Sequence, residues 1–189
     1  MADRIPTEIW IGGKIAAPLI PGLCAAISDA GVSLAWGDAQ FHPADANDLT
    51  NALVDSADGA PLLWLCDDEA SWGEFDGLEK FLEEQRISFT RQSEGRYEYE
   101  PERVEFRPGA GKVCLATDRS GEPVVRAAEL VDLEGSLTKT LQLVQGGETK
   151  RATSALRTAI KKLRRALPPS VPPLEPFEIV AAREPHPPK

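Results

Sequence analysis

The sequence has no long hydrophobic run and few cysteines, and each shortage argues against a class of protein. None of its apolar stretches approaches the roughly 20 residues that a transmembrane helix needs, and the N-terminus lacks the basic-then-apolar order of a signal peptide. The three cysteines, Cys24, Cys66 and Cys114, are odd in number and widely spaced. We therefore expect buried thiols in a reducing compartment, and the sequence predicts a cytoplasmic protein without a membrane partner.

Histidine is also scarce, which removes many catalytic and metal-binding arrangements. Only His42 and His186 are present, and the sequence has neither a Cys-x-x-Cys pair nor a histidine cluster. Zinc sites are built from such groups, so we expect no cofactor. The segment 107–114 has two glycines and a lysine, but Phe106 and Val113 stand where a phosphate loop needs Gly and Ser or Thr. These gaps favour a non-enzymatic protein but leave the question of an enzyme open.

What the sequence does contain is enough apolar residue for a folded core and an uneven distribution of charge. Apolar residues make up 42% of the 189 and charged residues 27%, as in a folded globular protein. Residues 148–189 hold nine Lys or Arg against four Asp or Glu, a balance of +5, so the remaining −14 of the net −9 falls in residues 1–147. Two surfaces of opposite sign are expected, and free nucleic acid is an unfavourable partner for the acidic part.

Alternating and continuous apolar patterns in the first 121 residues predict a mixture of strands and helices. Strands are expected at 7–13, 32–36, 61–66, 87–93, 96–100, 103–106 and 112–116, and helices at 17–31, 45–57 and 72–85. Only the strand 61–66 is apolar throughout, so it should lie centrally and be buried on both faces. The other strands alternate, which favours a two-layer α/β sandwich: a mixed sheet with helices mainly on one face, and with Tyr97 and Tyr99 in a hairpin near its edge.

From residue 122 the pattern becomes purely helical. Leu130, Leu133, Leu137, Leu141 and Val144 recur every three or four residues until Gly146-Gly147, and the pattern resumes at Ala152 and ends at Pro168-Pro169. This predicts an antiparallel helical hairpin, with Gly135 able to divide its first helix. The expected organisation is an α/β domain at 1–121, a hairpin at 122–168 and a proline-rich extended tail at 169–189, in which Phe177, Ile179 and Val180 are apolar enough to dock.

The segment 62–85 places eight acidic residues behind the apolar strand. Ser71 and Glu74 have the spacing of a capping box, and acidic residues near a helix start are stabilised by the helix dipole. The alternative is a metal site, because Asp67, Asp68 and Glu69 follow a buried strand and offer three carboxylates that are suitable ligands for Mg²⁺. We favour the helix entrance, since no further carboxylate or histidine is evident as a partner.

Three candidate binding surfaces remain after these assignments. The first is acidic and comprises Asp76, Glu79, Glu83, Glu84, Glu98 and Glu100. The second is a basic stripe on the second hairpin helix, comprising Lys150, Arg157, Lys161 and Arg164. It would bind the acidic domain, another protein or phosphates, and its lack of aromatic residues makes nucleic acid the weaker choice. The third is Trp10, which points away from Ile9 and Ile11 toward the less covered sheet face.

Three hypotheses of function follow. The first is a non-enzymatic interaction protein, an adaptor or assembly subunit whose partner is another protein with a basic surface, unless the basic helix docks within the chain. The second is an acidic inhibitor that mimics nucleic acid, using Glu102 and Glu105 in addition to the acidic surface. The third is a Mg²⁺-dependent enzyme that uses Asp67, Asp68 and Glu69. The sequence favours the first.

Overall fold

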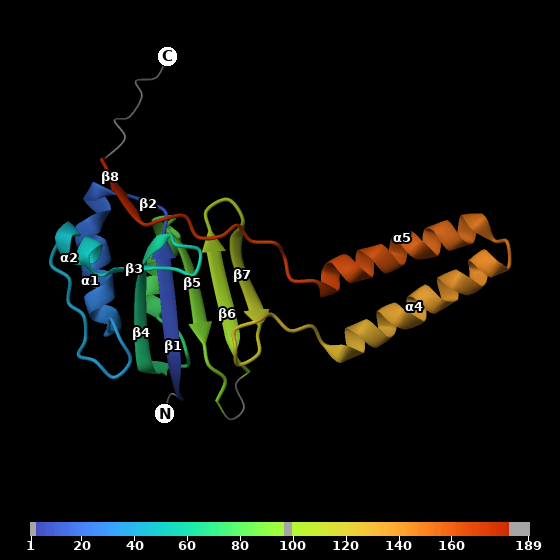
Figure 1. Cartoon of the computed structure of the whole chain (residues 1–189), viewed down its shortest axis with the longest axis horizontal. Helices are drawn as coiled ribbons and strands as arrows, with labels where there is room; N and C mark the ends of the chain where they lie inside the picture. The colour runs from blue at the N-terminus through green and yellow to red at the C-terminus, as the bar shows by residue number, and fades with distance from the viewer. Residues whose placement is uncertain (1–2, 97–99, 182–189) are drawn as a thin grey trace, which may run out of the picture. The chain divides into compact units, whose positions relative to one another are not determined.

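The computed structural model describes residues 3–96 and 100–181, and the chain divides into two compact units. Unit 1 consists of Met1–Gly121 together with Val171–Lys189, and unit 2 is Glu122–Ser170. Unit 2 is therefore an insertion: the chain leaves unit 1 after its last sheet strand and returns to it through the C-terminal tail (Figure 1).

Unit 1 is built around a six-stranded sheet. The strands of this sheet are β1 (Arg4–Gly12), β3 (Leu53–Asp55), β4 (Pro61–Ser71), β5 (Ser88–Ser93), β6 (Glu102–Arg107) and β7 (Gly111–Ala116). Unit 1 also contains the short strands β2 (Lys14–Ala16) and β8 (Glu178–Val180). Its helices are η1 (Ala17–Leu19), α1 (Ile20–Ala30), α2 (Ala46–Asn51) and α3 (Asp76–Glu84). The sheet has the order β3-β4-β1-β5-β6-β7 with antiparallel neighbours, while β2 and β8 form a separate parallel pair.

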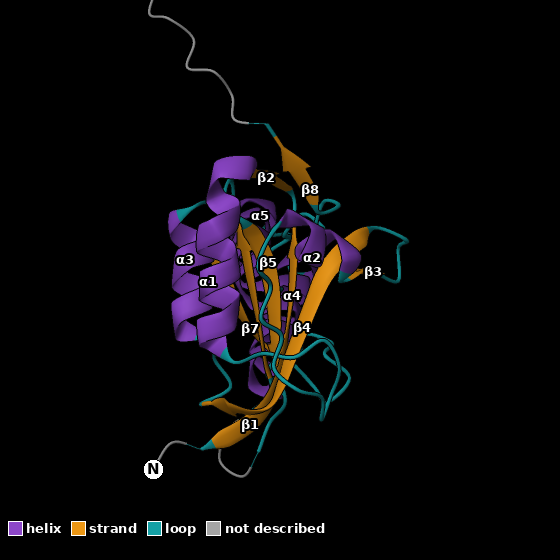
Figure 2. Ribbon diagram, turned by 90° about the vertical axis from the view of Figure 1, so that its left-hand side faces the viewer, coloured by secondary structure: helices purple, strands orange, loops and turns teal. Residues whose placement is uncertain are grey.

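Helices α1 and α3 lie side by side on one face of the sheet (Figure 2). Many strand residues that point toward these helices are apolar and fully buried, among them Ile9 and Ile11 of β1, Leu63 and Leu65 of β4, and Phe89 of β5. Leu23 and Ile27 of α1 fill the same core, and α1 ends at Gly31, whose φ of 70° is the left-handed conformation that glycine adopts freely. The predicted two-layer α/β fold with helices mainly on one face is confirmed.

Several local predictions were wrong. The helix expected at 45–57 covers only Ala46–Asn51, and Leu53–Asp55 form the edge strand β3 instead. Residues 32–36 do not form a strand: Ser33 alone makes bridges, to Gln40 and Cys66, and the chain then turns away. Helix α3 begins after its N-cap Phe75, and Ser71 is the last residue of β4, so the capping box does not form. Strand β4 extends through the acidic residues because β1 is long enough to pair with them, with Thr7 opposite Asp67 and Arg4 opposite Ser71. β4 lies one strand in from the sheet edge, between β3 and β1.

The tail after the hairpin is part of unit 1. The backbone N–H of Gly13 donates to the Glu175 carbonyl at 2.9 Å, and that of Phe177 donates to the Pro61 carbonyl at 2.8 Å. The Phe177 side chain is buried in the core beneath this crossing. The tail thus closes one end of the sheet before β8 pairs with β2.

Unit 2 is the predicted helical hairpin, formed by α4 (Ala127–Gln145) and α5 (Thr149–Ala166), which pack against each other. Gly135 does not divide α4, because tertiary contact with α5 outweighs the roughly 1 kcal/mol that a glycine costs in a helix. The turn uses Gly147 with φ 76°. Within the described residues, no helix combines the length and apolar character that crossing a bilayer requires.

Candidate functional site

The acidic residues Asp67, Asp68 and Glu69 lie on one strand and do not converge. Side chains alternate between the two faces of a strand, so Asp68 accepts a hydrogen bond from the Gly37 backbone N–H at 2.7 Å while Asp67 accepts from the Glu69 backbone N–H at 2.9 Å. Across the described part of the chain, no group of three or more His, Cys, Asp or Glu side chains is arranged to hold a metal ion. The carboxylates of Asp67 and Asp68 thus stabilise strand and loop backbone.

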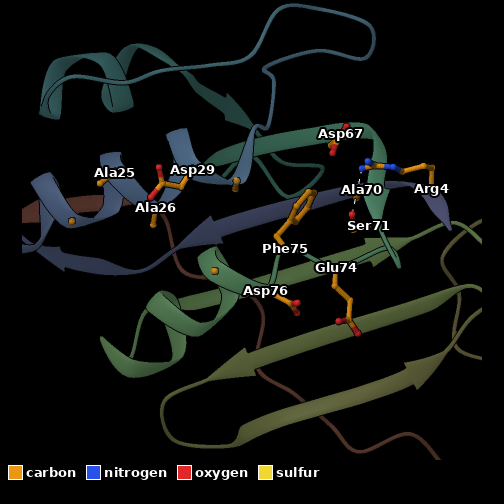
Figure 3. A pocket seen from close by; sticks show the side chains of 13 residues that line it. Arg4, Ala25, Ala26, Asp29, Asp67, Ala70, Ser71, Glu74, Phe75 and Asp76 are labelled. Atoms are coloured by element: carbon orange, nitrogen blue, oxygen red, sulfur yellow. Dashed lines mark hydrogen bonds between the residues drawn. The ribbon is translucent and has the colours of Figure 1, made fainter. Parts of the chain in front are cut away.

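A cavity of about 490 Å³ lies beside this strand, between α1 and the start of α3. Figure 3 shows the side chains that line it. Asp67 and Arg4 line one side of it, and Glu74 and Asp76 line the other. Arg4 donates to the carbonyl of Glu69 and to the hydroxyl of Ser71, so its guanidinium is already engaged. Burial and a hydrogen bond with Asp76 raise the pKa of Glu74. The cavity has carboxylates from α1, β4 and the start of α3, and among the described residues that line it the one cation, Arg4, holds the end of β4.

The acidic surface predicted on α3 needs a correction, because Glu79 is 4% exposed. Its carboxylate lies 2.7 Å from Nε of Arg91, a β5 residue that is 2% exposed, and 3.3 Å from Nζ of Lys112 on β7. Arg91 also contacts Glu102 at 2.8 Å, and Lys112 contacts Glu83 at 2.7 Å. Desolvation lowers the pKa of Lys112, but the hydrogen bond and charge of Glu83 and the charge of Glu79 outweigh it and raise that pKa.

This ion-pair network removes several acids from any free acidic surface. Glu79 is buried, while Glu83 and Glu102 are paired with cations from neighbouring strands, and Glu105 lies 3.2 Å from Arg103. Asp76, Glu84 and Glu100 remain exposed. Glu98 lies outside the described residues, as do Tyr97 and Tyr99 of the expected hairpin. The surface that would imitate nucleic acid is therefore smaller and more interrupted than the sequence indicates.

A tryptophan cluster lies on the sheet face opposite the helices. Trp10 and Trp64 are cross-strand neighbours with ring centroids 6.0 Å apart, and Trp36 meets Trp64 edge-on at 6.0 Å. Glu8 accepts hydrogen bonds from the indole N–H groups of Trp64, at 2.9 Å, and Trp10, at 3.4 Å. Trp10 is half-buried and its polar atom is satisfied, so it is not the exposed apolar residue that we expected. Trp36 is more exposed, at 43%.

The cysteines differ sharply in their environment, which gives a direct chemical test of the fold. Burial, reinforced by the nearby charges of Asp68 and Glu8, raises the pKa of Cys66 to about 11, and burial also raises that of Cys24. Cys114 is exposed, which corrects the expectation that all three thiols are buried, although partial desolvation and the charge of Glu102 also raise its pKa. At pH 8 we expect one thiol of the native protein to react with a disulfide reagent, and three after denaturation. Cys114→Ser should abolish the native reaction, and a fast thiol surviving in that variant would contradict the fold.

The hairpin is packed in an unusual way, because its inter-helix seam is made of small side chains. Thr140 of α4 and Ala152 and Ala159 of α5 are the buried residues of the two helices. Eight large apolar residues of the hairpin are exposed by between 37% and 58%. They are Leu130, Leu137, Leu141 and Val144 of α4, with Leu156, Ile160, Leu163 and Leu167 of α5 and its C-cap. We call these eight residues the apolar hairpin face.

Helical geometry places the apolar hairpin face on one side of the hairpin. At about 100° per residue, its α4 members lie roughly 40–100° around the axis from Thr140, and its α5 members lie roughly 40–100° in the same sense from Ala159. Since the helices are antiparallel, equal rotations of the same sense point to the same side. The ion pair between Asp132 and Lys162, 2.8 Å long, falls about 60–80° the other way and marks the opposite side.

The predicted basic stripe flanks this face. Lys150, Arg157, Lys161 and Arg164 lie roughly 140–200° from Ala159, next to Ile160 and Leu167 and away from α4. Helix α5 carries seven Lys or Arg and no Asp or Glu, whereas α4 carries three acidic residues and Lys139. The hairpin thus presents an apolar face with a cationic edge along α5.

No protein family, curated protein or solved structure matches the chain. The candidate site therefore depends on geometry alone. Sequence periodicity identified every α4 member of the apolar hairpin face, but it did not show that these residues point away from α5. The signal was present as Ala152, Ala159 and Ala166, spaced seven apart, because small residues at that spacing let two helices approach closely and leave no room for leucine between them.

Proposed function

We propose that this chain is a non-enzymatic interaction protein, an adaptor or assembly subunit, and that the apolar hairpin face is its binding surface. The observation that carries the proposal is the side-by-side exposure of eight large aliphatic residues on one face of two helices. Monomeric proteins rarely leave an apolar patch of this extent open to water, and patches rimmed by charge are typical of protein interfaces.

The energetics support the same conclusion. Completing the burial of a half-exposed Leu, Ile or Val contributes roughly 1 kcal/mol, so the eight residues together supply about 8 kcal/mol before the entropic cost of association. The exposed carboxylates of unit 1 would contribute much less free energy to binding, because salt screens isolated surface charges. Binding through the apolar hairpin face should therefore survive high salt.

A pull-down from native lysate with low-salt and high-salt washes tests the proposal. The wild-type protein should retain a defined partner through high salt, and Leu137→Glu should lose it because the substitution places a charge inside the contact. Val131→Glu is the matched control, since Val131 is 69% exposed on α4 but lies roughly 180° from Thr140, off the apolar hairpin face. Equal retention by both variants would overturn the proposal.

A further inference from the structure

We infer that the apolar hairpin face binds a second copy of itself, so that two hairpins form a four-helix bundle in which α4 of each copy lies over α5 of the other. The inference rests on the proposed function and names the partner. Its starting point is the inverted packing of the hairpin: the small residues are inside, between α4 and α5, and the large ones are outside. A four-helix bundle needs its large apolar residues in the layer between the two helix pairs.

The dimensions of the face suit a self-complementary contact. Helices of 19 and 18 residues are about 28 Å long, and two packed helices are about 20 Å wide. A face of this size, corrugated by side chains, approaches the roughly 800 Å² per partner that stable interfaces bury. Its two halves are also alike, with four members from α4 and four from α5 or its C-cap. A two-fold axis can therefore place either half on the other.

Two arrangements bring the apolar hairpin faces together: α5 of one copy lies over α5 of the other, or α4 lies over α5. Charge selects between them. If α5 lay over α5 of the other copy, the stripe of Lys150, Arg157, Lys161 and Arg164 would meet its own image, and like charges repel. If α4 lies over α5, the outer edge of α4 meets that stripe, and Glu134 is the charged residue at this edge. The Asp132–Lys162 pair fixes the register of the hairpin, and in that register Glu134 is within one residue's rise, about 1.5 Å, of Lys161.

This arrangement has a consequence that can be measured. A two-fold axis parallel to the helices keeps every residue at its own height, so the α4–α5 turns of both copies lie at the same end of the bundle. The rejected arrangement, with its axis across the helices, puts the two turns at opposite ends, about 28 Å apart along the bundle.

Light scattering and sedimentation equilibrium of the purified full-length protein, from low-micromolar to near-millimolar concentration, test the inference. We expect a dimer for the wild type and for Val131→Glu. Leu137→Glu should raise the dimer dissociation constant at least ~100-fold, because a carboxylate would be buried without a partner, while its helical circular dichroism stays unchanged. Glu134→Lys should weaken the dimer about 10-fold and increase its sensitivity to salt.

A spin label on Gln145→Cys, in a Cys114→Ser background, then reports the arrangement through the label-to-label distance. A label-to-label distance well below the bundle length of about 28 Å supports the arrangement with α4 over α5. A distance near or above that length overturns it. A wild-type protein that stays monomeric at every concentration overturns the inference, and leaves the proposed function standing if Leu137→Glu still loses a partner in the pull-down. If Leu137→Glu alters neither assay, both fail.

Discussion

Replacing Arg91 by alanine is expected to lower the free energy of unfolding of unit 1 by about 3–5 kcal/mol, because the substitution leaves a carboxylate buried without its main cation. Arg91 and Glu79 are 2% and 4% exposed, and the guanidinium also donates to the Gly73 carbonyl and to Glu102. Lys112 is 3.3 Å from the second oxygen of Glu79 and is shared with Glu83, so it offsets only part of the loss. The melting temperature should fall by roughly 10 °C.

Urea unfolding followed by tryptophan fluorescence measures this effect, since all four tryptophans belong to unit 1. The matched control is Lys162→Ala, which removes an ion pair of similar length whose side chains are 43% and 67% exposed. Exposed pairs contribute about 0–1 kcal/mol, so this variant should unfold at nearly the wild-type midpoint by circular dichroism. The double variant Arg91→Met with Glu79→Met should recover most of the loss. If Arg91→Ala lowers the free energy of unfolding no more than Lys162→Ala does, the prediction is wrong.

The Arg91–Glu79 network also shows where sequence reasoning reached its limit. Asp76, Glu79 and Glu83 form a stripe by helical spacing, and a stripe of like charges indicates either solvent or a basic partner. The partner is internal, but Arg91 and Lys112 reach Glu79 only because β5 and β7 join the same sheet. Strand order is set by long-range pairing, which leaves no local trace in the sequence.

Elements that depend on local pattern were predicted well. Helices α4 and α5 follow from a 3.6-residue period and from Gly146-Gly147, and α1 ends at the expected Gly31. The start of α3 was misplaced because the Ser71–Glu74 spacing satisfies a local rule, whereas pairing with β1 carries β4 through Ser71. Local capping contributes about 1 kcal/mol, less than the ladder of hydrogen bonds along an extended strand.

The sequence predicted the tail of unit 1 only as an apolar segment able to dock. Removing the buried ring of Phe177 from this tail is the second substitution expected to destabilise the protein strongly. Phe177→Ala should lower the free energy of unfolding of unit 1 by about 3–5 kcal/mol, because the ring fills the core beneath the tail and the surrounding strands cannot collapse fully into the cavity. The flanking backbone is fixed on both sides, by Gly13 and by Pro61, so the loss should also loosen β8 from β2.

Two matched variants separate the ring from the backbone of the tail. Glu175→Ala changes an exposed side chain in the same segment and should leave the midpoint of tryptophan-detected urea unfolding unchanged. Gly12→Ala acts from the opposite side of the contact, since a Cβ at Gly12 would stand 2.3 Å from the Glu175 carbonyl oxygen and would push the tail away. Gly12→Ala should therefore destabilise unit 1 and raise amide exchange at Phe177 and Glu178, whose N–H groups the tail contact protects. If Phe177→Ala and Gly12→Ala both unfold at the wild-type midpoint, the tail does not close the sheet, and unit 2 would then be a C-terminal extension instead of an insertion.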